Sequence, residues 1–227
     1  MSLTARVALC ILGLASGCRT APVLGVDTPG PSECDTDATA QSLMEYEQSI
    51  VGPGAIAGLQ PLASDTLPTD VREVRLWYRR AWYGTGSVLQ IRARGDSVTG
   101  TLIVFARSPM HPPGERPVRP RSCRPLGESS TLLACEAVFP APVDWRAVLT
   151  DLEAYRVWTL PDPSTLPPLE SVVTDGHGVL AEVRRGSCYH RYSYGNPDAY
   201  SIPEYRDAAG IMRVEADIRS RWNAAAQ

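Results

Sequence analysis

Histidine and carboxylate side chains are the residues of this sequence best suited to acid–base chemistry. The three histidines are His111, His177 and His190. A catalytic histidine needs a nucleophile or a carboxylate within hydrogen-bond distance. Glu182 is near His190 in sequence, but strand alternation places the two side chains on opposite faces of a hairpin. We therefore interpret His190 as a structural residue.

Acidic residues also occur in pairs, but no spacing singles out a pair for catalysis. Asp35 and Asp37 lie near the N-terminus, and Asp151 and Glu153 lie in a predicted helix. Glycoside hydrolysis needs two carboxylates held facing each other across a cleft. The motifs GxSxG, HExxH, GxGxxG and the P-loop are absent from the sequence. We predict no catalytic residue, no metal site and no cofactor.

The basic residues exclude further chemistry. All 22 are arginine, and the formal net charge is -3. The absence of lysine excludes Schiff-base catalysis, a Ser–Lys dyad and a P-loop lysine. The net charge gives no electrostatic reason to expect nucleic-acid binding.

The sequence LWYRRAWYG at residues 76–84 is the strongest indication of recognition. Trp, Tyr and Arg dominate binding hot spots. If these side chains are exposed, they could bind an envelope protein, a glycan or lipid headgroups; packing inside a sheet is the alternative, and both stay open. The candidate binding residues are Trp77, Arg79, Arg80, Trp82 and Tyr83.

The elements that must position these residues are mainly hairpins. Residues 179–194 alternate apolar with polar side chains, which predicts two antiparallel strands. We place the turn at Arg185-Gly186, so that Val183 pairs with Cys188. Residues 87–105 predict a second hairpin around Gly95-Asp96, with Leu89, Ile91 and Leu102 on one face. A further strand is expected from Val71, with Trp77 on the face opposite Leu76 and Tyr78, and another at residues 131–139.

Helical periodicity occurs at residues 38–50 and 144–155 and from Pro203 to about Trp222. Asp144 is the expected N-cap of the second helix. Hairpins joined to helices predict an α+β fold: an antiparallel β-sheet of about five to seven strands with two or three helices packed on one face.

The cysteines predict disulfides. Of the six, Cys10 and Cys18 belong to the N-terminal segment, which leaves an even number. Cys123 and Cys135 flank a turn-like segment, and by exclusion Cys34 would join Cys188. The two other connectivities stay open.

Residues 1–18, MSLTARVALCILGLASGC, predict an export signal with one charge, a short apolar run and small residues. The segment Leu14-Ala15-Ser16-Gly17-Cys18 resembles the lipobox of bacterial lipoproteins. The resemblance implies lipid on Cys18 and attachment to the membrane. It divides the chain into a signal peptide (1–17), a lipid-anchored flexible tail (18–37) and a single α+β domain (38–227).

Two hypotheses for function follow. The favoured one is an exported cell-envelope lipoprotein, facing an oxidising compartment, whose domain is a non-enzymatic binding or structural module. Arg19 after the lipidated cysteine favours the outer membrane, by analogy with enterobacterial lipoproteins. The alternative is a secreted hydrolase with a site assembled from dispersed residues. A pocket that holds His177 or His190 with a carboxylate would favour the hydrolase.

Overall fold

The computed structural model describes residues 58–59, 62–63, 67–80, 86–107, 123–125, 132–137, 139, 141–173 and 176–225. The helix predicted at residues 38–50 lies outside them. The elements in chain order are β1 (Val71–Arg80), β2 (Gly86–Arg94), β3 (Ser97–Arg107), β4 (Cys123–Pro125), β5 (Leu132–Glu136), α3 (Trp145–Ala154), η3 (Pro163–Thr165), β6 (His177–Arg185), β7 (Cys188–Gly195), η4 (Pro197–Ala199) and α4 (Pro203–Ala225).

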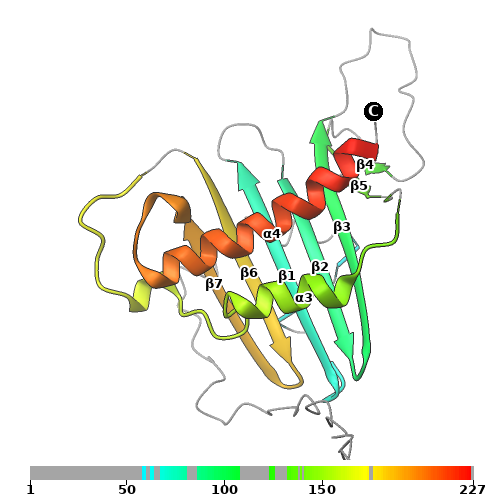
Figure 1. Ribbon diagram of the computed structural model, residues 1–227, viewed down its shortest axis with the longest axis horizontal. Coiled ribbons are helices and arrows are strands. Elements are labelled where there is room, and N and C mark those ends of the chain that lie inside the picture. Colours follow the sequence, from blue (N-terminus) through cyan, green and yellow to red (C-terminus); the bar gives the residue numbers. More distant parts are fainter. Residues whose placement is uncertain are drawn as a thin grey trace, which may run out of the picture.

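The strands form one seven-stranded sheet in the order β4-β5-β3-β2-β1-β6-β7. Every neighbouring pair is antiparallel. Helices α3 and α4 lie across the same face of the sheet (Figure 1). The predicted α+β fold, with helices on one face, is confirmed.

The β2–β3 hairpin has the predicted turn and register. Arg94 pairs with Ser97, so Gly95 and Asp96 form the turn. Gly95 has a φ of 53°, which glycine adopts without steric cost. Leu89, Ile91 and Leu102 are buried under the helices, as the alternation predicts.

The predicted turn of the β6–β7 hairpin is wrong by one residue. Arg185 pairs with Cys188 and Val183 with His190, so the turn residues are Gly186 and Ser187. Gly186 has a φ of 56° at the first turn position, the place where a type II′ turn needs glycine. The pairing is displaced by an even number of residues. The predicted grouping of side chains by face therefore still holds.

The helices begin and pack as their periodicity predicts. The Asp144 carboxylate accepts hydrogen bonds from the backbone N–H groups of Arg146 and Ala147, which caps α3. The buried side of α3 carries Val148, Leu149 and Leu152. Burial of each such side chain contributes about 1.5–3 kcal/mol. Helix α4 adds Tyr205, Ala208, Ile211, Met212 and Ile218 to the same core.

The sheet face opposite the helices has a core of its own. Trp77, Val88, Ile103, Phe105, Ala134 and Leu180 form a second buried cluster there. Buried charged side chains lie beside it: Glu73, Arg75, Glu182 and Arg184. A buried charge is costly unless it is paired. Both faces of the sheet therefore carry groups that could form a functional site.

Candidate functional site

The predicted recognition sequence begins inside the protein. Trp77 lies in β1 on the face opposite the helices, with 3% of its surface exposed. Its indole N–H donates to Glu182 Oε2 at 2.8 Å. The side chains of Arg79 and Arg80, and both Trp82 and Tyr83, lie outside the described part of the chain. A binding role for those four residues stays a prediction.

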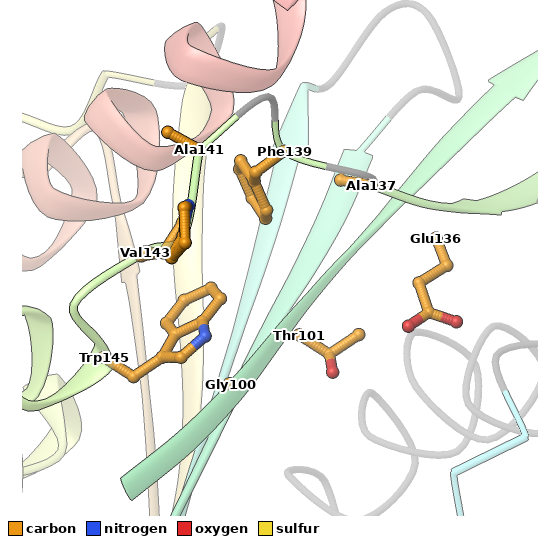
Figure 2. A pocket seen from close by; sticks show the side chains of 9 residues that line it. Gly100, Thr101, Glu136, Ala137, Phe139, Ala141, Val143 and Trp145 are labelled. Atoms are coloured by element: carbon orange, nitrogen blue, oxygen red, sulfur yellow. The ribbon is translucent and has the colours of Figure 1, made fainter.

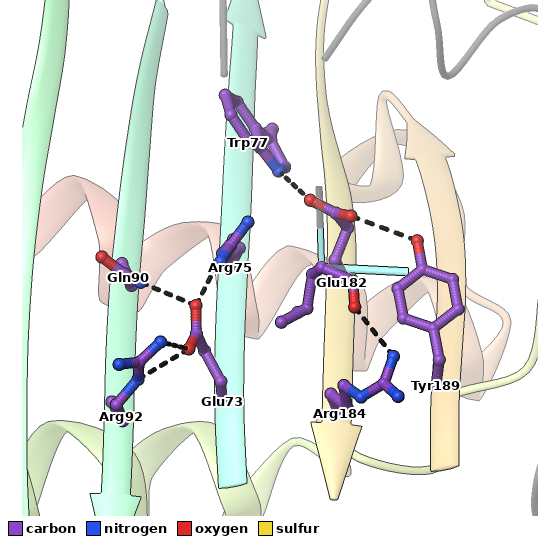
Figure 3. Close-up of polar contacts among 9 residues, drawn as sticks. Glu73, Arg75, Trp77, Gln90, Arg92, Glu182, Arg184 and Tyr189 are labelled. Carbon is purple, nitrogen blue, oxygen red and sulfur yellow. Dashed lines mark hydrogen bonds and ion pairs between the residues drawn. The ribbon is translucent and has the colours of Figure 1, made fainter. Parts of the chain in front are cut away.

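Glu182 is enclosed by hydrogen-bond donors from two strands. The Trp77 indole contacts Oε2, and the Tyr189 hydroxyl donates to Oε1 at 3.1 Å (Figure 3). Beside it, Arg184 donates to the backbone carbonyls of Leu62 and Ala63 at 2.9 and 3.0 Å. These hydrogen bonds give partners to the buried polar groups of Glu182 and Arg184, which would destabilise the fold if they were buried without partners.

Glu73 is fully buried and accepts hydrogen bonds from three side chains. Its carboxylate accepts from Arg75 Nε at 2.6 Å, Gln90 Nε2 at 2.6 Å and Arg92 Nε at 2.8 Å (Figure 3). Burial works to raise the pKa of Glu73. The charge of Arg75 and the hydrogen bonds from Gln90 and Arg92 outweigh it and hold the pKa below its usual value.

The register explains this polar network. Glu73 stands opposite Arg92 in β2 and opposite Arg184 in β6, while Arg75 stands opposite Glu182. Opposite charges therefore alternate across the central strands, an arrangement that stabilises a sheet. Each carboxylate is held by donors. We interpret the network as structural.

The helical face carries a pocket of a different kind. A cavity of about 430 Å³ lies between α4, η4 and the ends of β1 and β6, and we call it the α4 pocket. Its apolar wall includes Tyr78, Met212 and Ala216, and its polar wall includes His177, Asp198, Tyr200, Arg206 and Arg213. The volume lies in the range of small-molecule sites.

A tight turn brings His177 and Asp198 together. Asn196 ends β7 in the left-handed region, with a φ of 46°, which asparagine tolerates better than most residues. Its Oδ1 accepts from the His177 N–H at 3.0 Å, and its own N–H donates to the His177 carbonyl at 2.7 Å. The chain then turns through η4, so that Asp198 Oδ1 lies 3.0 Å from His177 Nε2.

Tyr78, in the wall of the α4 pocket, contacts an aromatic and a cationic side chain. The ring of Tyr78 stacks on His177, with 6.3 Å between centroids. On Tyr78 also lies the Arg219 guanidinium, 4.5 Å from the ring centroid, which is a cation–π distance. Arg219 in turn lies 3.8 Å from the buried Glu215. These contacts hold Tyr78 and His177 in place before any ligand binds.

His177 and Asp198 are acid–base side chains among the described residues that line the α4 pocket. A histidine beside a carboxylate can act as a general base. No Ser, Thr or Cys side chain occurs among the described residues that line the pocket. The described lining therefore contains no aliphatic hydroxyl or thiol that His177 could activate in the way a serine or cysteine hydrolase requires.

A second hollow lies beside β3. Trp145 and Phe139 pack edge to face over it, with 5.9 Å between ring centroids. Trp145 lies directly against Gly100, and Thr101 and Glu136 form the opposite wall (Figure 2). This hollow has a volume of about 320 Å³ and is lined mainly by apolar residues. It lacks the concentration of charge found in the α4 pocket.

His190 lies outside the α4 pocket. Its Nε2 is 2.7 Å from the Leu160 carbonyl, and its ring contacts Tyr192. This is the environment of a structural histidine. His111 lies outside the described residues.

The predicted Cys123–Cys135 disulfide is present and joins opposing residues of β4 and β5. Cys188 is also disulfide-bonded. Its predicted partner Cys34, and the lipidation residue Cys18, lie outside the described residues, so both assignments stay predictions.

The described residues contain no cluster of three or more candidate metal ligands. Within the same part of the chain, no helix has the length and hydropathy to cross a membrane.

Sequence reasoning missed most of the α4 pocket. Asp198, Arg206 and Arg213 were not singled out, because His177 and the two arginines lie in elements far apart in the sequence. One signal was available: Arg206 and Arg213 are seven residues apart, which places them on one side of a helix.

No known protein family matches this sequence, and no curated protein matches it. The structure itself shows an antiparallel α+β domain with a cavity beside its last helix that is lined by charged and apolar side chains.

Proposed function

We propose that this protein is an exported cell-envelope lipoprotein whose folded domain is a non-enzymatic binding module. The export signal and the lipobox-like end of residues 1–18 support attachment to a membrane, with the outer membrane favoured, through lipid on Cys18. The Cys123–Cys135 disulfide is typical of proteins in oxidising compartments. The α4 pocket is the proposed binding site.

One observation carries the binding role: the α4 pocket combines an apolar wall with several polar groups that converge on it. Met212 and Ala216 offer apolar surface, while Arg206, Arg213 and His177 offer hydrogen-bond donors. Ligand sites in proteins have this composition, a mostly apolar cavity in which a few polar groups fix the orientation of the ligand.

Ligand capture tests the binding role. The protein is isolated from its native envelope, and small molecules and proteins that co-purify are identified. Ala216→Trp fills the α4 pocket, because Ala216 lines it. Ala154→Trp places the same side chain at an exposed position on α3 and is the matched control.

We expect a ligand to co-purify with the wild type and with Ala154→Trp. The same ligand is expected to be absent from Ala216→Trp. Identical co-purifying sets for all three proteins would contradict a binding role for the pocket.

Metabolic labelling with a radioactive fatty acid tests the anchor. The wild type is expected to incorporate label and to sediment with membranes. Cys18→Ala is expected to carry no label, because the lipid requires the cysteine thiol. Label that persists in Cys18→Ala would exclude Cys18 as the lipidation site.

The His177–Asp198 pair favours a second candidate, a hydrolase in which His177 activates water. The separation of 3.0 Å suits a carboxylate that orients an imidazole. A hydrolase that activates water needs no protein nucleophile, so the His177–Asp198 pair could supply its general base. We place this candidate second because the pair alone does not identify a bond to be cleaved. Hydrolysis of a captured ligand by the wild type, abolished in His177→Ala, would favour the hydrolase.

A further inference from the structure

We infer that the α4 pocket binds a small organic anion: an acidic group joined to an apolar body. This inference rests on the proposed function, since it assumes that the pocket is a binding site. Three observations carry it: the charges that line the pocket, the spacing of those charges along α4 and the size of the cavity.

Two positive charges of the pocket have no carboxylate partner among the described residues. Several arginines of the described sheet and helices do contact a carboxylate, as Arg72 does with Glu153 and Arg156 with Asp207. In the same part of the chain, the guanidinium groups of Arg206 and Arg213 form no ion pair. Arg213 Nε donates to the Ala209 carbonyl at 3.3 Å, and both arginines are exposed to solvent, so they are accessible to a ligand. Two such cations on one cavity favour an anionic ligand.

The helix sets the spacing of these cations. Arg206 and Arg213 are two turns apart in α4, a rise of about 10 Å. Ala209 and Met212 lie between them in the sequence and line the same cavity. A ligand that lies along α4 therefore meets a guanidinium at either end and apolar surface between them. A compact acid can pair its acidic group with one of the two arginines while its apolar body lies on the middle of the cavity.

The remaining walls agree with this orientation. Tyr78 lines the cavity but is largely buried, and its ring contacts the Arg219 guanidinium and the His177 ring. Asp198 contributes a negative charge to the cavity wall, and its Oδ1 lies 3.0 Å from His177 Nε2. An anionic group is expected to avoid Asp198 and to contact the arginines, and an apolar or aromatic body is expected to rest on Tyr78 and Met212.

The cavity sets an upper limit on the ligand. Its volume of about 430 Å³ is near the lower end of small-molecule sites. The ligand is therefore expected to be a compact acid and not a polymer.

Calorimetric titration of the full chain with a matched pair of probes tests the inference. Phenylacetate has an acid and an aromatic body, phenylacetamide has the same shape without the charge, and inorganic phosphate has the charge without the body. We expect saturable binding of phenylacetate and at least about tenfold weaker binding of the other two, because a hydrogen bond to a charged group is worth about 1.5–3 kcal/mol.

Substitutions locate the binding site. The double substitution Arg206→Ala with Arg213→Ala is expected to weaken phenylacetate binding at least about tenfold. Arg221→Ala is the matched control, because Arg221 is an exposed arginine of the same helix that does not line the pocket. It is expected to leave the affinity unchanged.

Three outcomes overturn the inference: equal binding of the acid and the amide, equal binding of phosphate, or no saturable binding of phenylacetate at up to about 10 mM, where a fragment of this size should bind. If the wild type but not Ala216→Trp captures a neutral ligand, the proposed binding module is supported. Only the inference of an anionic ligand is then rejected. Capture that is identical in all variants would contradict both the binding role of the pocket and the anionic ligand.

Discussion

Glu215 is a carboxylate placed where water cannot reach it. It lies on the buried side of α4 with 1% of its surface exposed, and its Oε1 accepts from the Ser87 hydroxyl of β2. Burial raises the pKa of Glu215, and the charge of Arg219 and the Ser87 hydrogen bond reduce the effect without cancelling it. The ionised form is therefore disfavoured in the folded protein.

This raised pKa makes stability depend on pH. The folded state binds the Glu215 proton more tightly than the unfolded chain does. The resulting stabilisation is complete below the unfolded pKa and is lost as the pH rises through the folded pKa. Glu215→Gln keeps a hydrogen-bonding group for Ser87 and cannot ionise. We expect it to be more stable than the wild type by about 1 kcal/mol or more at pH about 8, with the gain absent at pH about 4.

Denaturant unfolding at both pH values measures the difference. Glu170→Gln makes the same substitution at an exposed position and is expected to change stability by less than about 0.5 kcal/mol at either pH. A Glu215→Gln protein that is less stable than the wild type at the higher pH would show that the ionised carboxylate stabilises the fold.

The contact between α3 and β3 depends on one glycine. Gly100 in β3 faces the Trp145 indole at the start of α3, and a Cβ at this position would overlap the six-membered ring (Figure 2). Glycine inside a strand often marks such a close approach. The absent side chain lets the helix lie against the sheet at this point.

Gly100→Ala is therefore expected to displace Trp145 and to lower the free energy of unfolding by about 1–3 kcal/mol, the usual cost of overpacking. Chemical denaturation followed by tryptophan fluorescence measures the change. Gly195→Ala is the control, because a Cβ added at Gly195 would meet no heavy atom within 4 Å, and it should be tolerated. In a Trp145→Ala background, Gly100→Ala should lose most of its effect.

At the scale of the whole molecule, the predicted Cys34–Cys188 disulfide would connect distant parts of the chain. The Cys123–Cys135 bond closes a short loop between neighbouring strands. Cys188, at the start of β7, is also disulfide-bonded. A bond from Cys34 to Cys188 would attach the N-terminal tail to the edge strand of the sheet.

Peptide mapping without reductant is expected to recover one peptide pair joined through Cys123 and Cys135 and another through Cys34 and Cys188. Because the second bond would close a loop of about 150 residues, Cys34→Ser is expected to lower stability by about 5 kcal/mol. Cys10→Ser should have no effect if the signal segment is removed. A free thiol at Cys34 in the native protein would exclude the pairing.

The fold was more predictable than the pocket. Alternation along β2 and β3 placed Leu89, Ile91 and Leu102 on the buried face, because the side-chain period of a strand is local. The turn after β6 was misplaced, because a positive-φ glycine fits either of two adjacent turn positions. Trp77 shows what a local pattern cannot predict. Alternation along its strand gave the face on which Trp77 lies. Its hydrogen-bond partner Glu182 belongs to a strand about a hundred residues away, which no local pattern reaches.

The sequence by itself determined the class of secondary structure, the hairpin faces, the cap of α3 and the likeness of residues 1–18 to a lipoprotein signal, because each depends on residues within a few positions of one another. Only the tertiary structure decided that His177 meets Asp198 and that Arg206 and Arg213 share a cavity with Tyr78. The turn through η4 brings Asp198 to His177 of β6, and the packing of α4 across the sheet brings the two arginines to Tyr78 of β1.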